Sequence, residues 1–227
     1  QPPLRIPFPE RTITKEHSIP FIPDIPKPGS KLNLDFWRTI PTYTDFQDED
    51  GKTLSVEQKI ELKMACTQDA LLIFAEFWEP VMNRLICNVD HNNGPVDNDD
   101  NISVFLNPGI ENQVYYCWLI NPLGCYKEFN IKQATGEPLG PWQAGGTEKV
   151  DIKTRIKNNS YLLQMYIPLK KLGIIPQQKT SWLFDVRRRR KIYAGNIRAR
   201  EQQFTGFFLW SGNREGWVKL RLAEALS

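Results

Sequence analysis

Oxygen-bearing side chains are concentrated just before one of the most β-rich parts of the chain. Asp97, Asp99, Asp100 and Asn101 lie directly before the run 102–106. Calcium takes roughly six to eight oxygen ligands, which such side chains and nearby backbone carbonyls can supply. The spacing of an EF-hand is absent. The alternatives are a structural calcium site held by the three aspartates, a solvated polar loop, or binding of hydroxyl groups by Asp99 and Asn101.

Groups suited to catalysis are scarce by comparison. A glycosidase needs two carboxyl groups that flank the sugar. The acids near aromatic strand sequence are Glu76, Glu79 and Glu128, and none has an evident partner. His17 and His91 lie in separate segments without the other members of a nucleophilic triad. The sequence therefore predicts no enzyme, with a jelly-roll glycosidase or lyase that uses Glu76 or Glu128 kept as the alternative.

The most basic segment, residues 187–191, raises the question of an anionic partner. The formal charge of the whole chain is only +3. Half of the basic side chains would alternate away from any one face of a strand, whereas phosphate binding needs a basic patch on one face. We therefore expect a solvated strand end and no nucleic-acid partner, while contact with an acidic glycan stays open.

Composition indicates one packed domain. The chain has 227 residues, of which 41% are hydrophobic and 11% aromatic, enough for a substantial core. No run approaches the roughly 20 apolar residues of a membrane helix. The N-terminus lacks a charged segment followed by an apolar stretch, so we expect that any signal peptide has been removed or never existed. Gln1-Pro2-Pro3 would suit a mature exported protein. The cysteines have no Cys-x-x-Cys spacing and are interpreted as small buried hydrophobes; they are Cys66, Cys87, Cys117 and Cys125.

Alternating or continuous apolar runs, separated by turn signals, extend along most of the chain. They predict about nine or ten strands and one helical turn at 169–172. The clearest strands are 60–66, 70–78, 102–106, 114–120, 150–156, 161–167, 182–186 and 218–222. Many short strands indicate an all-β fold, an antiparallel two-sheet β-sandwich of jelly-roll type. Residues 1–30 hold close to half of the prolines, which predicts an extended Pro-rich arm, with the sandwich domain in 31–227.

Several motifs follow one another in a fixed order. An aromatic pair is followed by Leu-Leu-Ile-Phe-Ala-Glu, by an acidic loop that enters Val-Phe-Leu-Asn-Pro, and by Tyr-Tyr-x-Trp-x-Ile-Asn-x-x-Gly. Later come Ile-Pro-x-x-x-Leu-Gly, Trp-x-Phe-x-x-Arg and Trp-Ser. These motifs lie at 36–37, 71–76, 99–108, 115–124, 167–173, 182–187 and 210–211. Together they resemble the family 9-like carbohydrate-binding modules of secreted bacterial polysaccharide-degrading systems, over roughly residues 35–223.

The resemblance implies a non-catalytic, secreted, periplasmic or cell-surface protein that captures a polysaccharide or oligosaccharide, including a chain end. Such modules sandwich a terminal sugar between two tryptophans, and Trp78 and Trp210 are the best matches, unless they fill the core. Arg187 matches an arginine expected on the binding face, where its planar fork could contact two sugar oxygens; an inter-strand ion pair is the alternative. Asp99 and Asn101 complete the predicted hydrogen-bonding set. The resemblance also implies structural calcium in some members.

Other tryptophans occupy positions that look internal or ambiguous. Trp37, Trp118, Trp182 and Trp217 are expected to be internal, and Trp142 could face either way. Members of the family often carry acids where this chain has Asn101 and Ser103, so the predicted rim is less acidic than usual. A monomer is expected. A structural or adhesive module without a sugar site is the third hypothesis.

Overall fold

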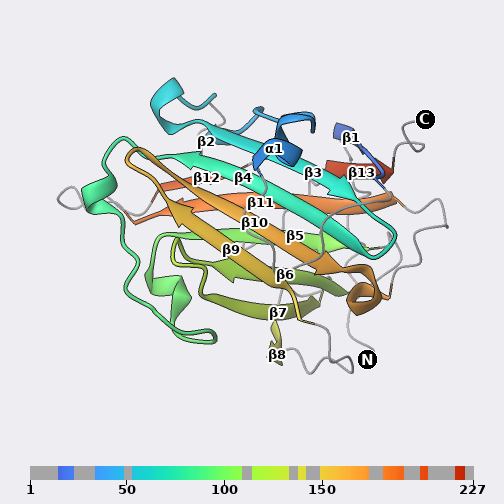
Figure 1. Cartoon of the computed structure of the whole chain (residues 1–227). Coiled ribbons are helices and arrows are strands. Elements are labelled where there is room, and N and C mark those ends of the chain that lie inside the picture. The colour runs from blue at the N-terminus through green and yellow to red at the C-terminus, as the bar shows by residue number, and fades with distance from the viewer. Residues whose placement is uncertain are drawn as a thin grey trace, which may run out of the picture.

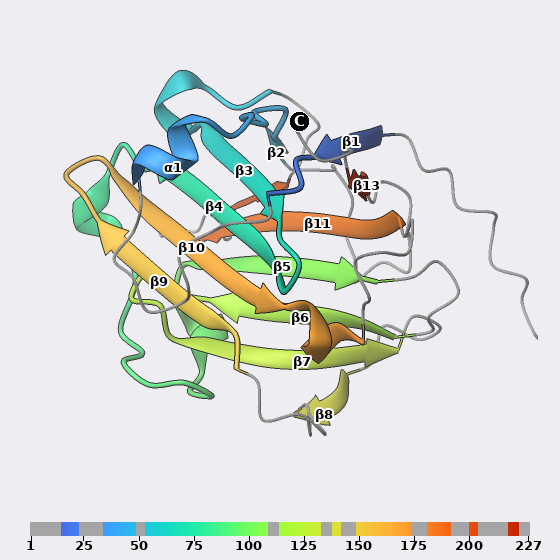
Figure 2. The same ribbon diagram turned by 45° about the vertical axis from the view of Figure 1, so that its right-hand side comes forward.

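Two stacked β-sheets form the body of the molecule (Figure 1), and their stacking is also visible after rotation (Figure 2). The computed structural model describes residues 15–22, 34–48, 53–108, 114–132, 138–141, 149–173, 181–191, 200–203 and 218–222. Over these residues the predicted two-sheet β-sandwich is confirmed.

The smaller sheet has four strands within the described residues, in the order β3-β4-β10-β9. All three pairings are antiparallel. The bounds are Ile60–Cys66 for β3, Ala70–Trp78 for β4, Asp151–Ile156 for β9 and Ser160–Pro168 for β10. A short 3-10 helix, η4, follows at Leu169–Leu172, where the sequence predicts a helical turn.

The larger sheet has nine strands among the described residues. Its main path runs β1-β13-β11-β5-β6-β7-β8, with β12 pairing both β11 and β2. The bounds are β1 Lys15–Ile19, β2 Gln47–Asp48, β5 Asn101–Asn107, β6 Val114–Ile120, β7 Tyr126–Lys132, β8 Pro138–Pro141, β11 Ser181–Arg190, β12 Arg200–Gln203 and β13 Val218–Leu222. The sheet departs from a purely antiparallel one because β1 pairs with β13 in parallel.

The N-terminal segment is described only in part. Residues 1–14 and 23–33 of the predicted arm and of the domain start lie outside the described residues. Between them, β1 joins the larger sheet, and Phe21 forms an isolated parallel bridge with Cys66 of β3. The division of the chain at residue 30 stays a prediction.

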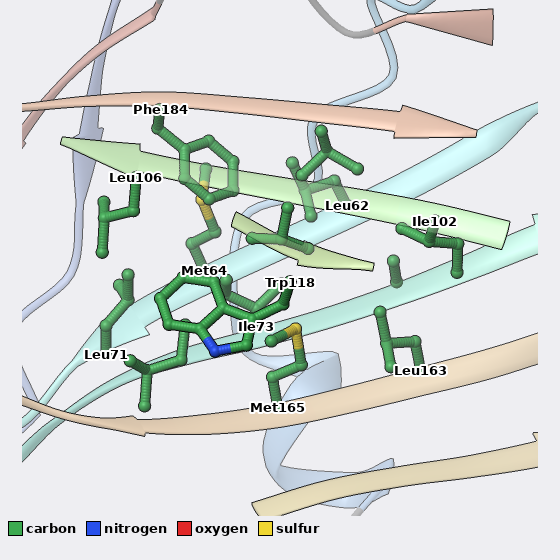
Figure 3. Close-up of a cluster of buried hydrophobic side chains, with 14 of the residues drawn as sticks. Leu62, Met64, Leu71, Ile73, Ile102, Leu106, Trp118, Leu163, Met165 and Phe184 are labelled. Carbon is green, nitrogen blue, oxygen red and sulfur yellow. The ribbon is translucent and has the colours of Figure 1, made fainter. Parts of the chain in front are cut away.

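Alternation along the strands produces the main core between the sheets. Leu62 and Met64 of β3 meet Phe184 of β11 and the fully buried Trp118 of β6 (Figure 3). The indole N–H of Trp118 donates to a carboxylate oxygen of Glu128 at 2.8 Å, so the ring's polar atom is satisfied. The prediction of internal positions is confirmed for the described tryptophans Trp37, Trp118 and Trp182. Trp142 and Trp217 lie outside the described residues.

A short helix covers part of the outer face of the smaller sheet. In α1, Leu34–Arg38, the Trp37 ring stacks on Phe74 of β4 with 5.3 Å between centroids. The Trp37 indole N–H donates to Gln164 at 3.1 Å, and Lys63 Nζ donates to the Trp37 carbonyl at 2.6 Å. This cover explains why β4 is apolar on both faces. The remaining short helices are η1 Val56–Gln58, η2 Met82–Arg84 and η3 Val96–Asn98.

Nothing among the described helices has the length and hydropathy needed to cross a bilayer.

The four cysteines are free thiols. Cys66 and Cys117 are buried, as expected for small core residues, and burial raises the pKa of the Cys66 thiol to about 12. Cys87 and Cys125 are half-buried. A thiol with a raised pKa is rarely a thiolate at neutral pH, so Cys66 acts as a packing residue.

Candidate functional site

One end of the sandwich gathers the elements that carry most of the predicted site residues. Strand β4 ends there at Trp78, β11 ends at Arg190, and β5 begins at Asn101 (Figure 1). The next residue after β4, Glu79, donates its backbone N–H to the Asn159 carbonyl at 2.9 Å. We name this region the Trp78 end. Trp78, Arg187, Asp99 and Asn101 thus lie on or next to elements that reach the same end of the sandwich.

Trp78 and Arg187 nevertheless project from opposite faces of the sandwich. Phe77 points into the core and stacks on Tyr161, so Trp78 projects from the outer face of the smaller sheet. Arg187 follows the core residue Val186 and therefore projects from the outer face of the larger sheet. Because packed sheets are separated by roughly 10 Å, one sugar ring cannot contact both side chains. The structure does not bring these two predicted residues together.

Trp78 is a half-buried aromatic ring surrounded by charged pairs. Lys59 Nζ lies 4.1 Å from the ring centroid and pairs with Glu61 at 2.7 Å. Glu76 lies two residues before Trp78 in β4, on the same face of the sheet. It accepts hydrogen bonds from Lys157 Nζ at 2.8 Å and from the Ser160 hydroxyl at 2.7 Å. An indole beside such donors and acceptors can stack on the C–H face of a sugar while its hydroxyl groups find partners.

Arg187 forms the ion pair that the sequence left as an alternative. Its Nε lies 3.1 Å from Asp185 Oδ2, and its guanidinium lies 5.2 Å from the Phe105 ring centroid. Both charged side chains are buried. A buried guanidinium without a carboxylate would be strongly unfavourable, so Asp185 neutralises Arg187 where it lies.

The expectation of a solvated strand end at residues 187–191 is wrong. Arg188 is 0% and Arg190 is 2% exposed, while Arg189 between them is exposed. Glu79 accepts from Arg188 Nη2 at 2.7 Å and from Arg190 Nε and Nη2 at 2.7 and 2.5 Å. We name these three residues the Glu79 cluster. Its carboxylate comes from the opposite sheet, so no local sequence spacing could reveal the pairing.

Asp99 organises the loop before β5 from inside. Its carboxylate accepts the backbone N–H groups of Asn88 at 3.0 Å and Val89 at 2.9 Å, and the side-chain amide of Asn121 at 2.9 Å. Asn101 donates its side-chain amide to the Asp99 carbonyl at 2.8 Å. Both residues are about 1% exposed. In this arrangement they hold the loop in place, with no open face toward solvent.

The other predicted calcium ligands also face donors. Asp100 accepts the backbone N–H groups of Ile86, at 3.0 Å, and of Lys191. Burial raises the pKa of Asp100, and these two hydrogen bonds oppose the rise. Asp97 accepts from Lys127 Nζ at 3.0 Å, which lowers the pKa of Asp97. Calcium requires open oxygens, so this donor set does not fit the ion. No metal-binding group of His, Cys, Asp or Glu occurs within the described ranges.

Exposed side-chain amides line the same loop and were not singled out from the sequence. They lie in the loop whose backbone N–H groups at Ile86, Asn88 and Val89 bond Asp100 and Asp99. The exposed members are Asn83, Asn88, Asn92, Asn93 and Asn98. The frequency of asparagine between residues 83 and 98 could have indicated this surface from the sequence. Planar side-chain amides can both donate hydrogen bonds to hydroxyl groups and accept them.

Gly94 in this loop leaves no space for a side chain. An added Cβ would lie 2.6 Å from Val89 Cγ1 and 2.9 Å from His91 Nε2. Replacing Gly94 with Ala should therefore lower the free energy of unfolding by about 1–3 kcal/mol through overpacking, measured by urea denaturation. The neighbouring Asn93 has a φ of 63°, so Asn93→Gly should be neutral or stabilising. Equal losses in both variants would contradict this account.

Glu76 and Glu128, the two candidate acids of the alternative enzyme hypothesis, belong to different sheets. Glu76 lies in β4 of the smaller sheet, whereas Glu128 lies in β7 of the larger one. Glu128 accepts from the buried Trp118 indole and pairs with Lys171 at 2.8 Å. The two carboxylates therefore do not flank a common point at which a glycosidic bond could lie.

Comparison with known proteins gives similarity at the level of structure. No family model and no curated protein matches the sequence. A family 9 carbohydrate-binding module from Caldicellulosiruptor kristjanssonii, solved with glucose, aligns with a TM-score of 0.64 and 14% identity over 94% of this chain and 97% of its own. The structure of such a module from the same organism with cellotriose aligns with a TM-score of 0.59 and 13% identity, covering 91% and 95%.

A third solved structure, from Bacteroides uniformis ATCC 8492, is named for an inferred ability to bind carbohydrate. It aligns with a TM-score of 0.66 and 15% identity over 92% of this chain and 99% of its own. The alignments cover nearly all of each chain, at identities that establish the fold alone. The chain therefore has the fold of a family 9-like carbohydrate-binding module, as its sequence motifs predicted.

Proposed function

We propose that this chain is an exported, non-catalytic protein that binds an uncharged polysaccharide or oligosaccharide, including a chain end. The observation that carries the proposal is the alignment over 94% of this chain and 97% of a family 9 module that was solved with glucose. The separation of Glu76 from Glu128 on different sheets supports binding without hydrolysis. Fold alone does not fix function, so the proposal depends equally on the Trp78 surface.

Trp78 is the proposed stacking surface. Among the described tryptophans it alone is outside the core, since Trp37, Trp118 and Trp182 are buried. The nearby Glu61 and Glu76 would accept hydrogen bonds from sugar hydroxyl groups. An aromatic platform gives large contact area at a small loss of side-chain entropy.

The remaining predicted residues take different places in this proposal. Trp210 lies outside the described residues and stays the predicted second ring. Asp99 and Asn101 act through the order of the loop, because their side chains are buried and bonded within it. Arg187 belongs to the opposite outer face, where Asp185 pairs with it.

The charge distribution at the Trp78 end favours an uncharged glycan over an acidic one. Arg188 and Arg190 are buried against Glu79, so most of the basic run cannot meet an anionic sugar. On the Trp78 face, Lys59 and Lys157 each pair with a glutamate. Recognition of uronate or sulfate would need cations that are directed at the ligand.

Trp78→Ala should weaken glycan binding by about fivefold or more, because truncating a central aromatic contact costs about 1 kcal/mol or more. A glycan array would identify a ligand, and calorimetric titration would give the affinity of wild type and variant. Trp78→Tyr keeps an aromatic face and should retain most of the binding.

Val56→Ala is the control for Trp78→Ala. Val56 is 80% exposed in η1, and this variant should bind glycan with the affinity of wild type. Release of sugars from a polysaccharide panel would support the enzyme hypothesis. Absence of binding to any glycan would support a structural or adhesive module, and undiminished binding by Trp78→Ala would place the site elsewhere.

A further inference from the structure

The backbone of Trp78 is held from the opposite sheet. Arg188 Nη1 donates to the Trp78 carbonyl at 2.7 Å, and its Nη2 donates to Glu79 Oε2 at 2.7 Å. The same guanidinium therefore bonds two consecutive residues, Trp78 and Glu79, at the C-terminal end of β4. The contact spans 110 positions of sequence.

Glu79 and Tyr161, which both contact Arg188, are buried and hold its guanidinium in place. Glu79 also accepts from Arg190 and from the Val81 backbone N–H at 3.0 Å. The Arg188 guanidinium lies 5.5 Å from the Tyr161 ring centroid, within the distance of a cation–π contact. A planar guanidinium can bridge two acceptors with defined geometry, which the single ammonium of lysine cannot reproduce.

We infer that Arg188 is a positioning residue for glycan binding: it orients Trp78 through the Trp78 carbonyl and does not contact the ligand. The inference rests on the proposed function of Trp78. The basic run thus supports the binding surface from within the protein. Arg190 bonds Glu79 and not Trp78, so it supports the Glu79 cluster alone.

Arg188 and Arg190 provide a matched pair of substitutions. Arg188→Lys and Arg190→Lys each keep a positive charge next to Glu79 and each remove a guanidinium from the Glu79 cluster. Both variants should therefore lose thermal stability. Only Arg188→Lys removes the donor to the Trp78 carbonyl, so only this variant should change the environment of the indole ring.

Two measurements test the inference. The protein is labelled with fluorotryptophan, and the Trp78 resonance is assigned in a fluorine NMR spectrum through Trp78→Phe. Arg188→Lys should shift and broaden this resonance and weaken glycan affinity by about fivefold or more. Arg190→Lys should leave the resonance and the affinity as in wild type. Equal effects of the two variants on both readouts, or no effect of Arg188→Lys, would overturn the inference.

A further measurement covers the case in which Arg188→Lys does not fold. In nitrogen-labelled wild type, glycan addition should shift the Arg188 guanidinium resonance and leave that of Arg190 unchanged, since Arg188 alone of the two bonds Trp78. No shift at Arg188 on saturation would refute the coupling. If wild type binds no glycan, the proposed function fails, whereas the fluorine spectrum still decides whether Arg188 orients Trp78.

Discussion

Replacing Glu79 with Gln should lower the free energy of unfolding by about 3 kcal/mol or more, the expected cost of leaving buried charges without their partner. The carboxylate is the shared acceptor of Arg188 and Arg190, and all three side chains are 3% exposed or less. For a chain of this length, such a loss corresponds to a fall of roughly 6–12 °C in Tm. Urea denaturation and calorimetry measure both quantities.

A surface ion pair on the smaller sheet, formed by Glu61 and Lys59, provides the control. Glu61 bonds Lys59 at 2.7 Å, with side chains 30% and 38% exposed. Solvent screens such pairs, and Glu61→Gln should cost no more than about 1 kcal/mol. If Glu79→Gln were as mild as Glu61→Gln, the Glu79 cluster would not be a principal connection between the two sheets.

Asp99→Asn should lower the free energy of unfolding by about 2–3 kcal/mol, because a carboxylate with three N–H donors is replaced by an amide whose own NH₂ must face one of them. The donors come from Asn88, Val89 and Asn121. The loss should be local as well as global. Hydrogen exchange at the Asn88 and Val89 amides should accelerate more than exchange in the central strands.

Asp97 and a chelator provide the comparison for Asp99. Asp97 is half exposed and forms a surface ion pair with Lys127, so Asp97→Asn should have little effect on stability. The predicted calcium site is tested in the same experiment. Because N–H and ammonium donors occupy the three aspartates, a chelator should leave the Tm of wild type unchanged. A chelator-sensitive Tm that Asp99→Asn abolishes would instead establish the calcium site.

Strand alternation made the core predictable. Apolar residues at every second position fix which face of a strand is buried, and Leu62, Met64 and Phe184 lie where that rule places them. The same rule placed Arg187 on the face opposite Phe184. It could not say to which sheet each strand belongs, and this missing assignment is why Trp78 and Arg187 were expected to share a ligand.

The Glu79 cluster lay beyond the reach of sequence reasoning for a related reason. A run of arginines resembles a solvated surface unless a buried acid is known to meet it, and Glu79 lies 109 positions from Arg188. The helix α1 was missed as well, because its five residues are too few for a helical period to be recognised. Its Trp37 was predicted to be internal, but what it packs against was not.

The parallel pairing of β1 with β13 determines where attached polypeptide would leave the sandwich. Strand β13 pairs with Ser181–Phe184 at the beginning of β11, whereas Arg188 lies near its end. Four strand residues span about 13 Å, so β13 and its partner β1 lie toward the beginning of β11, away from the Trp78 end (Figure 1). Because the two strands run parallel, a tether or neighbouring domain attached at the N-terminal end of β1 would leave the pair at the opposite end from one attached at the C-terminal end of β13.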